Sequence, residues 1–312
     1  IIAYTMLAGL VSVAYTDVAN GIIIIFSFVI AIPIFLAQAG GFSGMAASFE
    51  AMGKPEHMNF FGVYSTMDII NFCLPPFLLI MGDANMYQRF FASKDAKGAQ
   101  QATKVLIFAV LLAELMIIFS AWVASSMIPD AEVGKYVLIY AAHKLLPTFL
   151  GAIMMTTIVG IIISTADSFL LVPATTLMRD VYLNYINPNA DEKKIVFLSR
   201  MLVLGLGIIA YIVSLGFAKS AGFFERALYA YTIYGAAITP SLVAALFWKG
   251  ATKEGAVASI LTGTVTTLLW KEADFIQNII PKNIYNNMDE VLPAITLSVV
   301  SLVVVSLLTK KN

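Results

Sequence analysis

Hydroxyl and carboxylate side chains stand close together between Gly160 and Pro173, in a stretch otherwise rich in isoleucine and leucine. Three- and four-residue steps would place one set of residues on a single helix face: Ile161, Ser164, Thr165 and Ser168. Hydroxyls there, with any free backbone carbonyl, supply the oxygen shell that a small hard cation such as Na⁺ prefers. The alternative is that they bond only to the preceding turn or to a neighbouring helix. Asp167 lies off this face, and in lipid a carboxylate needs a polar partner.

A second carboxylate, Asp17, follows Thr16 in AGLVSVAYTDVANG (8–21), just before an apolar stretch. At that place it could cap first-turn N–H groups, where the helix dipole favours a negative charge. It could also guide a cation to or from the hydroxyl face of 161–168. One residue could fill both roles.

The segment 68–91 predicts an interrupted helix. Pro75 and Pro76 lack backbone donors, and Gly82 loosens the chain before Asp83 and Asn85. Transporters place substrate and ions at interrupted membrane helices, because freed carbonyls and half-helix ends supply polar groups there. Asp83 and Asn85 are therefore candidate substrate ligands. The alternative is a simple kink that leaves Asp83 near the membrane surface.

Two more apolar stretches carry polar side chains. Glu114 stands well inside 105–128 without a basic residue within one turn, so it should face protein or a cavity, or be protonated. Tyr229, Tyr231 and Thr232 lie in 227–248 and are candidate substrate contacts. Tyrosines that anchor the membrane surface are the alternative. The roles of Glu114 and Asp167 stay open.

Composition places these stretches in a membrane. The chain of 312 residues is 60% hydrophobic and 12% charged, with a formal net charge of zero, which gives no indication of a nucleic-acid partner. One cysteine, Cys73, and two histidines, His57 and His143, argue against a disulfide, zinc or haem site. No catalytic motif such as GxSxG, HExxH or a P-loop is present in the sequence, so we expect no enzyme and no catalytic residue.

Eight apolar stretches are long enough to cross about 30 Å of hydrocarbon as helices. They are 18–38, 64–83, 105–128, 149–178, 195–218, 227–248, 255–271 and 291–309. The connection 39–63 contains turn residues, and 134–147 predicts a helix lying on the surface. Of the 19 lysines and arginines, most fall on the side that holds Arg89, Arg179 and Lys310, which predicts a cytoplasmic C-terminus.

Four stretches together resemble the sodium:solute symporter family, in the family's order and at fitting separations. They are AGLVSVAYTDVANG, MYQRFFASKDAKGAQQA, ISTADSFLLVPATTLMRDVY and YGAAITPSLVAALFWKGATKEGAVASILTG. The resemblance implies an all-α integral membrane protein with the LeuT-type bundle of two inverted five-helix repeats, working by alternating access. It covers nearly the whole chain up to about Trp270.

The resemblance also implies site residues. In the family, sodium binds between the eighth core helix and the broken first helix; the matching positions are Ser164, Thr165 and the carbonyl of Ile161, with Asp17 linked to that region. Sodium is then the only metal expected. Asp83 matches a position where sugar carriers place a polar substrate-contacting residue, and 227–248 matches the tenth core helix, which faces substrate.

Some positions depart from the family pattern. The paired glycine before the TD motif is Ala8-Gly9, the Gln after it is Asn20, and the lysine of sugar carriers is matched by Val110. These departures argue against a sugar substrate.

The resemblance makes 1–312 one partial transporter domain of about eight transmembrane helices. Residues 1–15 would end a preceding helix and its connection, 16–248 would be core helices five to ten, and 249–312 would be additional C-terminal helices. The first four core helices would belong to a missing N-terminal part, so we expect this polypeptide alone not to transport.

We expect sodium-coupled symport of a small organic solute by a multi-pass protein of the cell membrane, with the bilayer and the missing helices as partners. Two alternatives remain: a proton-coupled carrier that uses Asp17, Asp167 or Glu114 as relay, and a transporter-like sensor module of a signalling protein.

Overall fold

The computed structural model describes residues 2–129, 136–217, 222–285 and 287–310, and throughout these ranges its regular structure is helical. Within them, seven helices are long and apolar enough to cross a membrane. They are Val13–Gln38, Thr66–Phe91, Ala96–Ser125, Thr148–Ile186, Glu192–Gly216, Phe224–Phe247 and Val291–Thr309. The expected all-α membrane architecture is confirmed.

The chain divides into two compact units, each of which combines segments far apart in the sequence. Unit 1 comprises Ile1–Gly62 and Gln88–Ser214, and unit 2 comprises Val63–Tyr87 and Leu215–Asn312. Each unit is described by itself.

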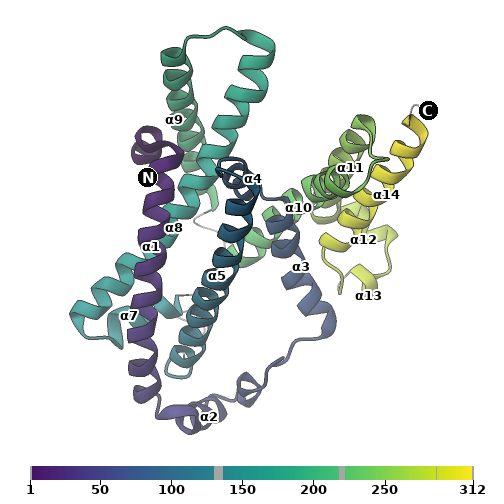
Figure 1. The fold of residues 1–312 in the computed structure, drawn as a ribbon. Coiled ribbons are helices and arrows are strands. Elements are labelled where there is room, and N and C mark those ends of the chain that lie inside the picture. The colour runs from purple at the N-terminus through teal and green to yellow at the C-terminus, as the bar shows by residue number, and fades with distance from the viewer. Residues whose placement is uncertain (1, 130–135, 218–221, 286, 311–312) are drawn as a thin grey trace. The chain divides into compact units, whose positions relative to one another are not determined.

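Unit 1 is built around the long helix α1 (Ile2–Gln38), which packs along α5 (Ala96–Ser125) and α8 (Thr148–Thr176), as Figure 1 shows. A short helix, α7 (Val137–Lys144), packs against α8. Beyond α8 the chain continues as a π-helix (Leu177–Ile186) and returns as α9 (Glu192–Phe217). The core of the unit is formed by Phe28, Phe35, Phe49, Val123 and Met154, among others.

Helix α1 differs from the expected arrangement at its N-terminal end. We expected 1–15 to contain the end of one helix and a connection, but α1 runs without a break from Ile2 to Gln38. The segment around Thr16 and Asp17 contains no proline to stop it, and Gly21 lies beyond them. Asp17 therefore lies in the interior of a helix and is not an N-cap.

The connection 39–63 is more ordered than a turn. Gly40 (φ 74°) and Gly41 (φ 68°) adopt the left-handed backbone that the predicted turn requires, and the chain then forms α2 (Gly41–Ala51). A 3₁₀ turn, Pro55–Met58, follows, and the carbonyl of His57 accepts a hydrogen bond from Trp122 Nε1 at 2.9 Å. Within 134–147 a helix is present as α7, while its place on the membrane surface stays a prediction; residues 130–135 lie outside the described residues.

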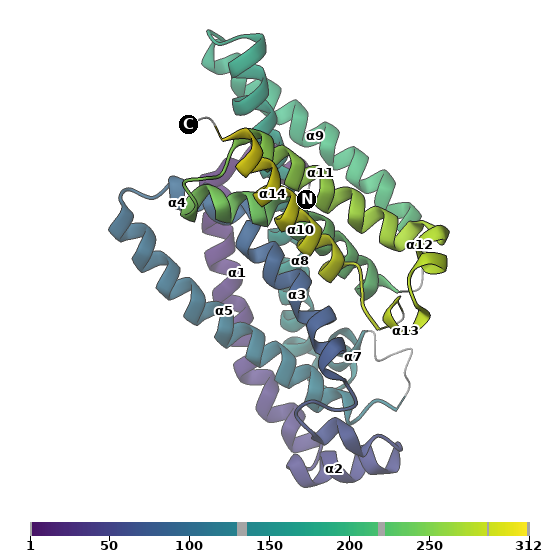
Figure 2. The same cartoon turned by 90° about the vertical axis from the view of Figure 1, so that its right-hand side faces the viewer.

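Unit 2 groups α3 (Thr66–Gly82), α10 (Phe223–Phe247), α11 (Lys253–Glu272) and α14 (Val291–Thr309), seen together in Figure 2. Helix α10 packs against the other three. Hydroxyl pairs join α11 to α14: Ser259 with Ser298 at 2.8 Å, and Thr252 with Thr309 at 2.7 Å. Short helices α12 (Asp274–Ile279) and α13 (Lys282–Tyr285) lie between α11 and α14 in the chain.

Helix α11 is the eighth stretch that we expected to span the membrane. It forms a helix of 20 residues but is not among the seven that are apolar enough. Its hydropathy is lowered by two charged residues at each end of the helix. The polar residues Ser259 and Thr267, which are both buried, lower it further. Helix formation was predicted correctly at this place, although the hydropathy signal for a span is weaker than we expected.

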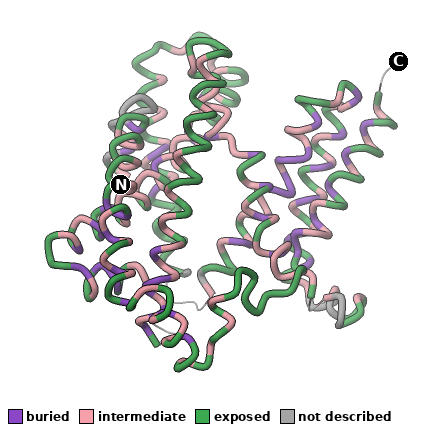
Figure 3. Tube along the Cα trace, turned by 60° about the horizontal axis from the view of Figure 1, so that its bottom comes forward, coloured by how far each residue is buried: buried purple, intermediate pink, exposed green. Residues whose placement is uncertain are grey.

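Outward faces of the long helices are apolar. In Figure 3 buried positions follow one side of many helices and exposed positions the other. On α5 the exposed side carries Val105 (69% exposed), Phe108 (70%) and Leu115 (65%). Such a face suits lipid or further apolar protein and would be unusual in water.

Candidate functional site

The hydroxyl of Ser164 meets the carboxylate of Asp17 where α8 packs on α1. Ser164 Oγ donates to Asp17 Oδ1 at 2.5 Å, although the two residues are far apart in the sequence. Both side chains are half-buried. The structure thus joins the TD motif to the hydroxyl face of 161–168.

Asp17 also forms an ion pair with a basic side chain of the same protein. Arg89, on helix α4 (Ala84–Phe91), donates from Nη2 to Asp17 Oδ2 at 2.9 Å and to Ser168 Oγ at 3.0 Å. The carboxylate therefore accepts a hydrogen bond from a hydroxyl on one oxygen and from a guanidinium on the other. In the sequence Arg89 served for orientation and as part of the MYQRFF stretch of the family resemblance, but it was not a candidate site residue; its place beside Gln88 was the signal that could have marked it.

Thr165 is exposed, and its hydroxyl bonds to the preceding turn of its own helix, which was the alternative to cation binding. Its Oγ1 donates to the carbonyl of Ile161 at 3.0 Å, one turn earlier in the same helix. The hydroxyl proton is used in this bond, while the hydroxyl oxygen of Thr165 keeps lone pairs that can coordinate a cation. Ile161, Ser164 and Thr165 thus offer oxygens from one turn of α8.

Asp167 has the polar partner that a buried carboxylate requires. Its side chain is 1% exposed, and Oδ1 accepts a hydrogen bond from Thr5 Oγ1 on α1. Two further contacts join the same helices: Asn20 Nδ2 donates to the carbonyl of Gly160 at 3.3 Å, and Ser27 bonds to Thr157 at 2.7 Å. Polar groups therefore hold α1 on α8 at several levels.

In unit 2 the interrupted helix breaks at Asp83. Pro75 and Pro76 lie inside α3, which ends at Gly82, and α4 begins at Ala84. Asp83 Oδ1 accepts from the backbone N–H and from Nδ2 of Asn85, both at 2.9 Å. Asn85 is 7% exposed. The predicted interruption is present, though it follows Gly82 and not the prolines.

Helix α10 supplies a tyrosine to this break. Tyr234 Oη accepts from the N–H of Ala84 at 3.2 Å, and Thr239 Oγ1 donates to the carbonyl of Leu78 at 2.6 Å. Tyr231 lies one turn before Tyr234 on α10, where 229, 231 and 232 were the candidate substrate contacts. Thr232 is buried, at 1% exposed, while Tyr229 and Tyr231 are half-buried.

Glu114 lies on an exposed part of α5, and no described residue forms an ion pair with it. We expected it to face protein or a cavity, or to be protonated, and the described residues of this chain place no protein over it. Among them, no three His, Cys, Asp or Glu side chains gather in a way that could hold a metal ion. The site on α1 and α8 instead combines hydroxyls and a carbonyl with a single carboxylate.

Comparison with known proteins settles the family. The profile of the Sodium:solute symporter family matches residues 1–263. The chain belongs to the sodium:solute symporter family. Its relatives are transporters and not enzymes, and the chain is a multi-pass membrane protein.

Curated relatives include several proline carriers. The chain is 25% identical over 315 residues to the osmoregulated proline transporter OpuE of Bacillus subtilis, covering 100% of this chain and 62% of the relative. It is 25% identical to the sodium/proline symporter of Haemophilus influenzae, covering 99% and 62%. It is 27% identical to the high-affinity proline transporter PutP of Bacillus subtilis, covering 90% and 60%. The chain thus spans about three-fifths of the length of these relatives.

A solved structure shows the fold. A Na⁺-coupled sialic acid symporter, solved in a substrate-bound outward-open state with a novel Na⁺ site, matches 99% of this chain and 65% of its own, with a TM-score of 0.73 and 14% identity. The chain therefore has the LeuT-like helical architecture that the resemblance implied.

Proposed function

We propose that this chain forms part of a secondary transporter that couples the inward movement of Na⁺ to that of a small organic solute by alternating access. The observation that carries the proposal is the contact of Ser164 with Asp17, beside Thr165 and the carbonyl of Ile161. These four groups supply oxygens with a single formal charge. Few formal charges around a small cation keep its binding reversible, as coupling requires.

Arg89 gives the site a way to exist without sodium. A bare carboxylate within a span is costly, and the guanidinium at 2.9 Å neutralises Asp17. The side chains of Arg89 and Asp17 are 37% and 24% exposed, so the described residues do not close over the pair. We infer that Na⁺ binds the oxygens around Ser164 and shares the charge of Asp17 with Arg89.

The solute would be bound by Asp83 and Asn85 at the interrupted helix, with Tyr229, Tyr231 and Thr232 on α10. Asp83 and Asn85 already bond to each other, and Tyr234 contacts the same break. The relatives' names make proline the first solute to test. A carboxylate and an amide would suit the ammonium or imino group of such a solute. The cytoplasmic C-terminus remains part of the proposal.

The test uses protein expressed from its entire gene and reconstituted in vesicles. Proline and a panel of small solutes are measured for uptake as a function of external sodium. We expect Ser164→Ala and Thr165→Ala each to raise the sodium concentration for half-maximal uptake by about tenfold, or ~1.4 kcal/mol.

Thr156→Ala is the matched control, because Thr156 is exposed on the same helix and bonds only one turn back, to the carbonyl of Ala152 at 2.9 Å. It should leave sodium activation unchanged. Equal effects at 156 and 165, or sodium activation that survives loss of both Ser164 and Thr165, would remove the site assignment.

A further inference from the structure

Unit 1 contains a cavity that lies apart from the proposed sodium and substrate residues. It measures about 300 Å³, roughly the volume of ten water molecules, and opens between α1, α8 and α9. Its apolar wall includes Met6, Leu171, Ala174 and Val203. Its polar wall includes Thr5, Thr175, Ser199 and Arg200. The lining thus combines one cation and three hydroxyls with apolar side chains.

Arg200 is the unusual member of this lining. It lies inside a span, Glu192–Gly216, is exposed, and forms no ion pair with any described residue. An arginine in a membrane helix normally pairs with another group or extends its head to the membrane surface. Ser199, next to it in the chain, lines the same cavity, and Thr175 lines it with a hydroxyl that donates to the carbonyl of Leu171 at 2.7 Å.

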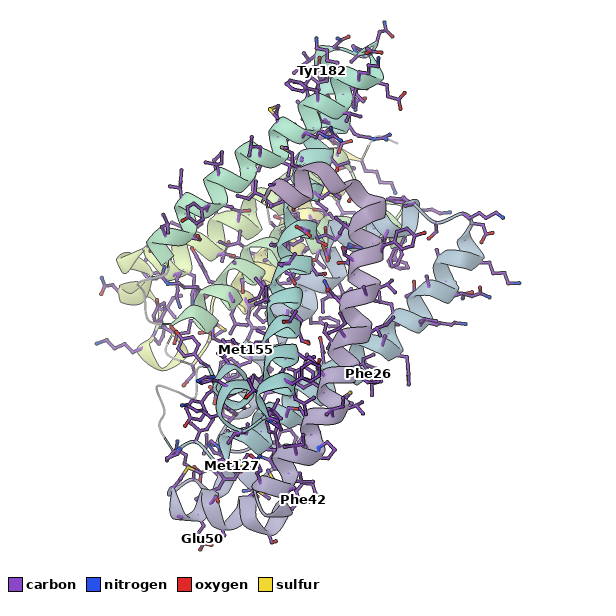
Figure 4. All side chains as sticks on the ribbon, turned by 90° about the vertical axis from the view of Figure 1, so that its left-hand side faces the viewer. Phe26, Phe42, Glu50, Met127, Met155 and Tyr182 are labelled. Carbon is purple, nitrogen blue, oxygen red and sulfur yellow. The ribbon has the colours of Figure 1, made fainter. Side chains whose placement is uncertain are left out.

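The level of the cavity in the bilayer follows from α8. Leu171 and Thr175 lie seven and eleven residues beyond Ser164, about 10 and 16 Å along the axis at about 1.5 Å per residue. Ser164 lies about midway along the expected span 149–178, which would place it near the midplane, so this range would end at the hydrocarbon boundary, about 15 Å from the centre. Beyond this level α8 continues into the π-helix, and the chain then returns as α9. Tyr182 lies near the tip of this helical hairpin in Figure 4.

We propose that this cavity is a binding site for an anionic phospholipid. The headgroup phosphate would accept hydrogen bonds from Arg200 and the hydroxyl of Ser199, while the first methylenes of an acyl chain would lie on Leu171, Ala174 and Val203. Arginine and hydroxyl groups are strong, directional donors to phosphate oxygens. The apolar wall explains why a lipid, and not a free anion, is the ligand.

The site also touches the polar contacts between α1 and α8. Thr5 lines the cavity and donates to Asp167, which is one residue from Ser168. A bound lipid would therefore hold the end of α1 that carries Thr5 against α8. The inference does not depend on which solute is carried.

The experiment measures lipid binding to the delipidated protein, expressed from its entire gene, by native mass spectrometry. Phosphatidylglycerol and phosphatidylcholine with identical acyl chains are added separately. We expect one phosphatidylglycerol to bind in preference to phosphatidylcholine, and Arg200→Gln to weaken it at least about fivefold, the value of one basic residue at a membrane surface.

Lys194→Gln is the matched control, because it removes the same charge from an exposed position on the same helix outside the cavity. Equal losses in both variants, equal binding of the two lipids, or no bound lipid because other protein covers the cavity would overturn the proposal. Inorganic phosphate alone is the third arm; if it displaces the lipid with the same affinity, the site takes a free anion and the lipid assignment is wrong.

Arg200→Lys and Ser199→Ala extend the test if Arg200→Gln does not fold. The lysine variant should keep most of the binding, since it keeps the charge. Ser199→Ala should weaken phosphatidylglycerol by about threefold through the loss of one donor. Unchanged affinity in Ser199→Ala together with a complete loss in Arg200→Lys would contradict the arrangement of donors described above.

Discussion

Three serines in unit 1 show how much the role of a hydroxyl depends on its partner. Ser164 donates to Asp17 on another helix, and Ser27 bonds to Thr157. Ser120, on α5, is fully buried, and its Oγ is the one buried side-chain oxygen or nitrogen without a partner among the described residues. A buried hydroxyl without a hydrogen bond costs free energy, whereas a paired one contributes.

We predict that Ser120→Ala stabilises the protein by about 1 kcal/mol, because it removes an unpaired polar atom and loses no hydrogen bond. Ser27→Ala is the control and should destabilise by about 0.6 kcal/mol, the typical value of a hydrogen bond between membrane helices. Thermal unfolding in a mild detergent measures both changes. A lower unfolding temperature for Ser120→Ala than for the unmodified protein would show that Ser120 has a partner in the membrane.

The site residues were predictable to different degrees. Ser164, Thr165 and Asp17 could be proposed from the sequence, because the spacing of the hydroxyls and the TD pair are visible in short local stretches. The bond between Thr5 and Asp167 and the ion pair between Arg89 and Asp17 join residues 162 and 72 positions apart. Such contacts depend on how helices pack, which no local pattern reports.

Helix ends were harder to predict than helix existence. Hydropathy located α1, but the polar residues 16 and 17 led us to expect a start where the helix is continuous. In α3 the two prolines remain inside the helix, and the break follows Gly82. The chain ends α3 at Asp83 because its carboxylate caps α4 through the N–H of Asn85. A capping side chain decided the boundary more than the loss of backbone donors did.

Close approach of α3 and α10 requires a glycine. A Cβ at Gly235 would lie 2.7 Å from Leu78 Cβ and 3.2 Å from the backbone of Leu78 and Leu79. We predict that Gly235→Ala destabilises the protein by about 1–3 kcal/mol, because two helices must move apart and the bond from Thr239 to Leu78 is strained.

Gly205→Ala is the matched control for this prediction. Gly205 lies inside α9 with nothing within 4 Å of the added methyl group, so alanine should stabilise the helix by about 0.5–1 kcal/mol. Opposite shifts of the unfolding temperature in the two variants are the expected result. A stabilising effect of alanine at both positions would mean that α3 and α10 do not pack as closely as described.

The membrane class of the whole chain could be predicted from composition, because long apolar runs are a property of the sequence itself. The division into two units could not. Unit 2 joins Val63–Tyr87 to Leu215–Asn312, and the bond between Leu78 and Thr239 spans 161 positions. The family resemblance supplied the architecture in which such distant segments meet, and the match to a solved symporter confirmed it.

The sodium coupling proposed above makes a prediction about the energetics of uptake across the membrane. Each Na⁺ that moves inward gains about 2.3 kcal/mol per 100 mV, enough for roughly fiftyfold accumulation of an uncharged or zwitterionic solute. We therefore expect uptake into vesicles to rise when a potassium diffusion potential, negative inside, is applied at equal sodium on both sides. Replacement of sodium by choline should abolish the effect at the same potential.

The same vesicles separate sodium coupling from proton coupling. With sodium absent, an inward proton gradient should drive no uptake, and Asp167→Asn should keep sodium-driven uptake if its carboxylate only receives the bond from Thr5. Uptake driven by protons alone, and lost in Asp17→Asn or Asp167→Asn, would contradict the sodium proposal. In that case the relay would be the carboxylate whose replacement abolishes the proton-driven uptake.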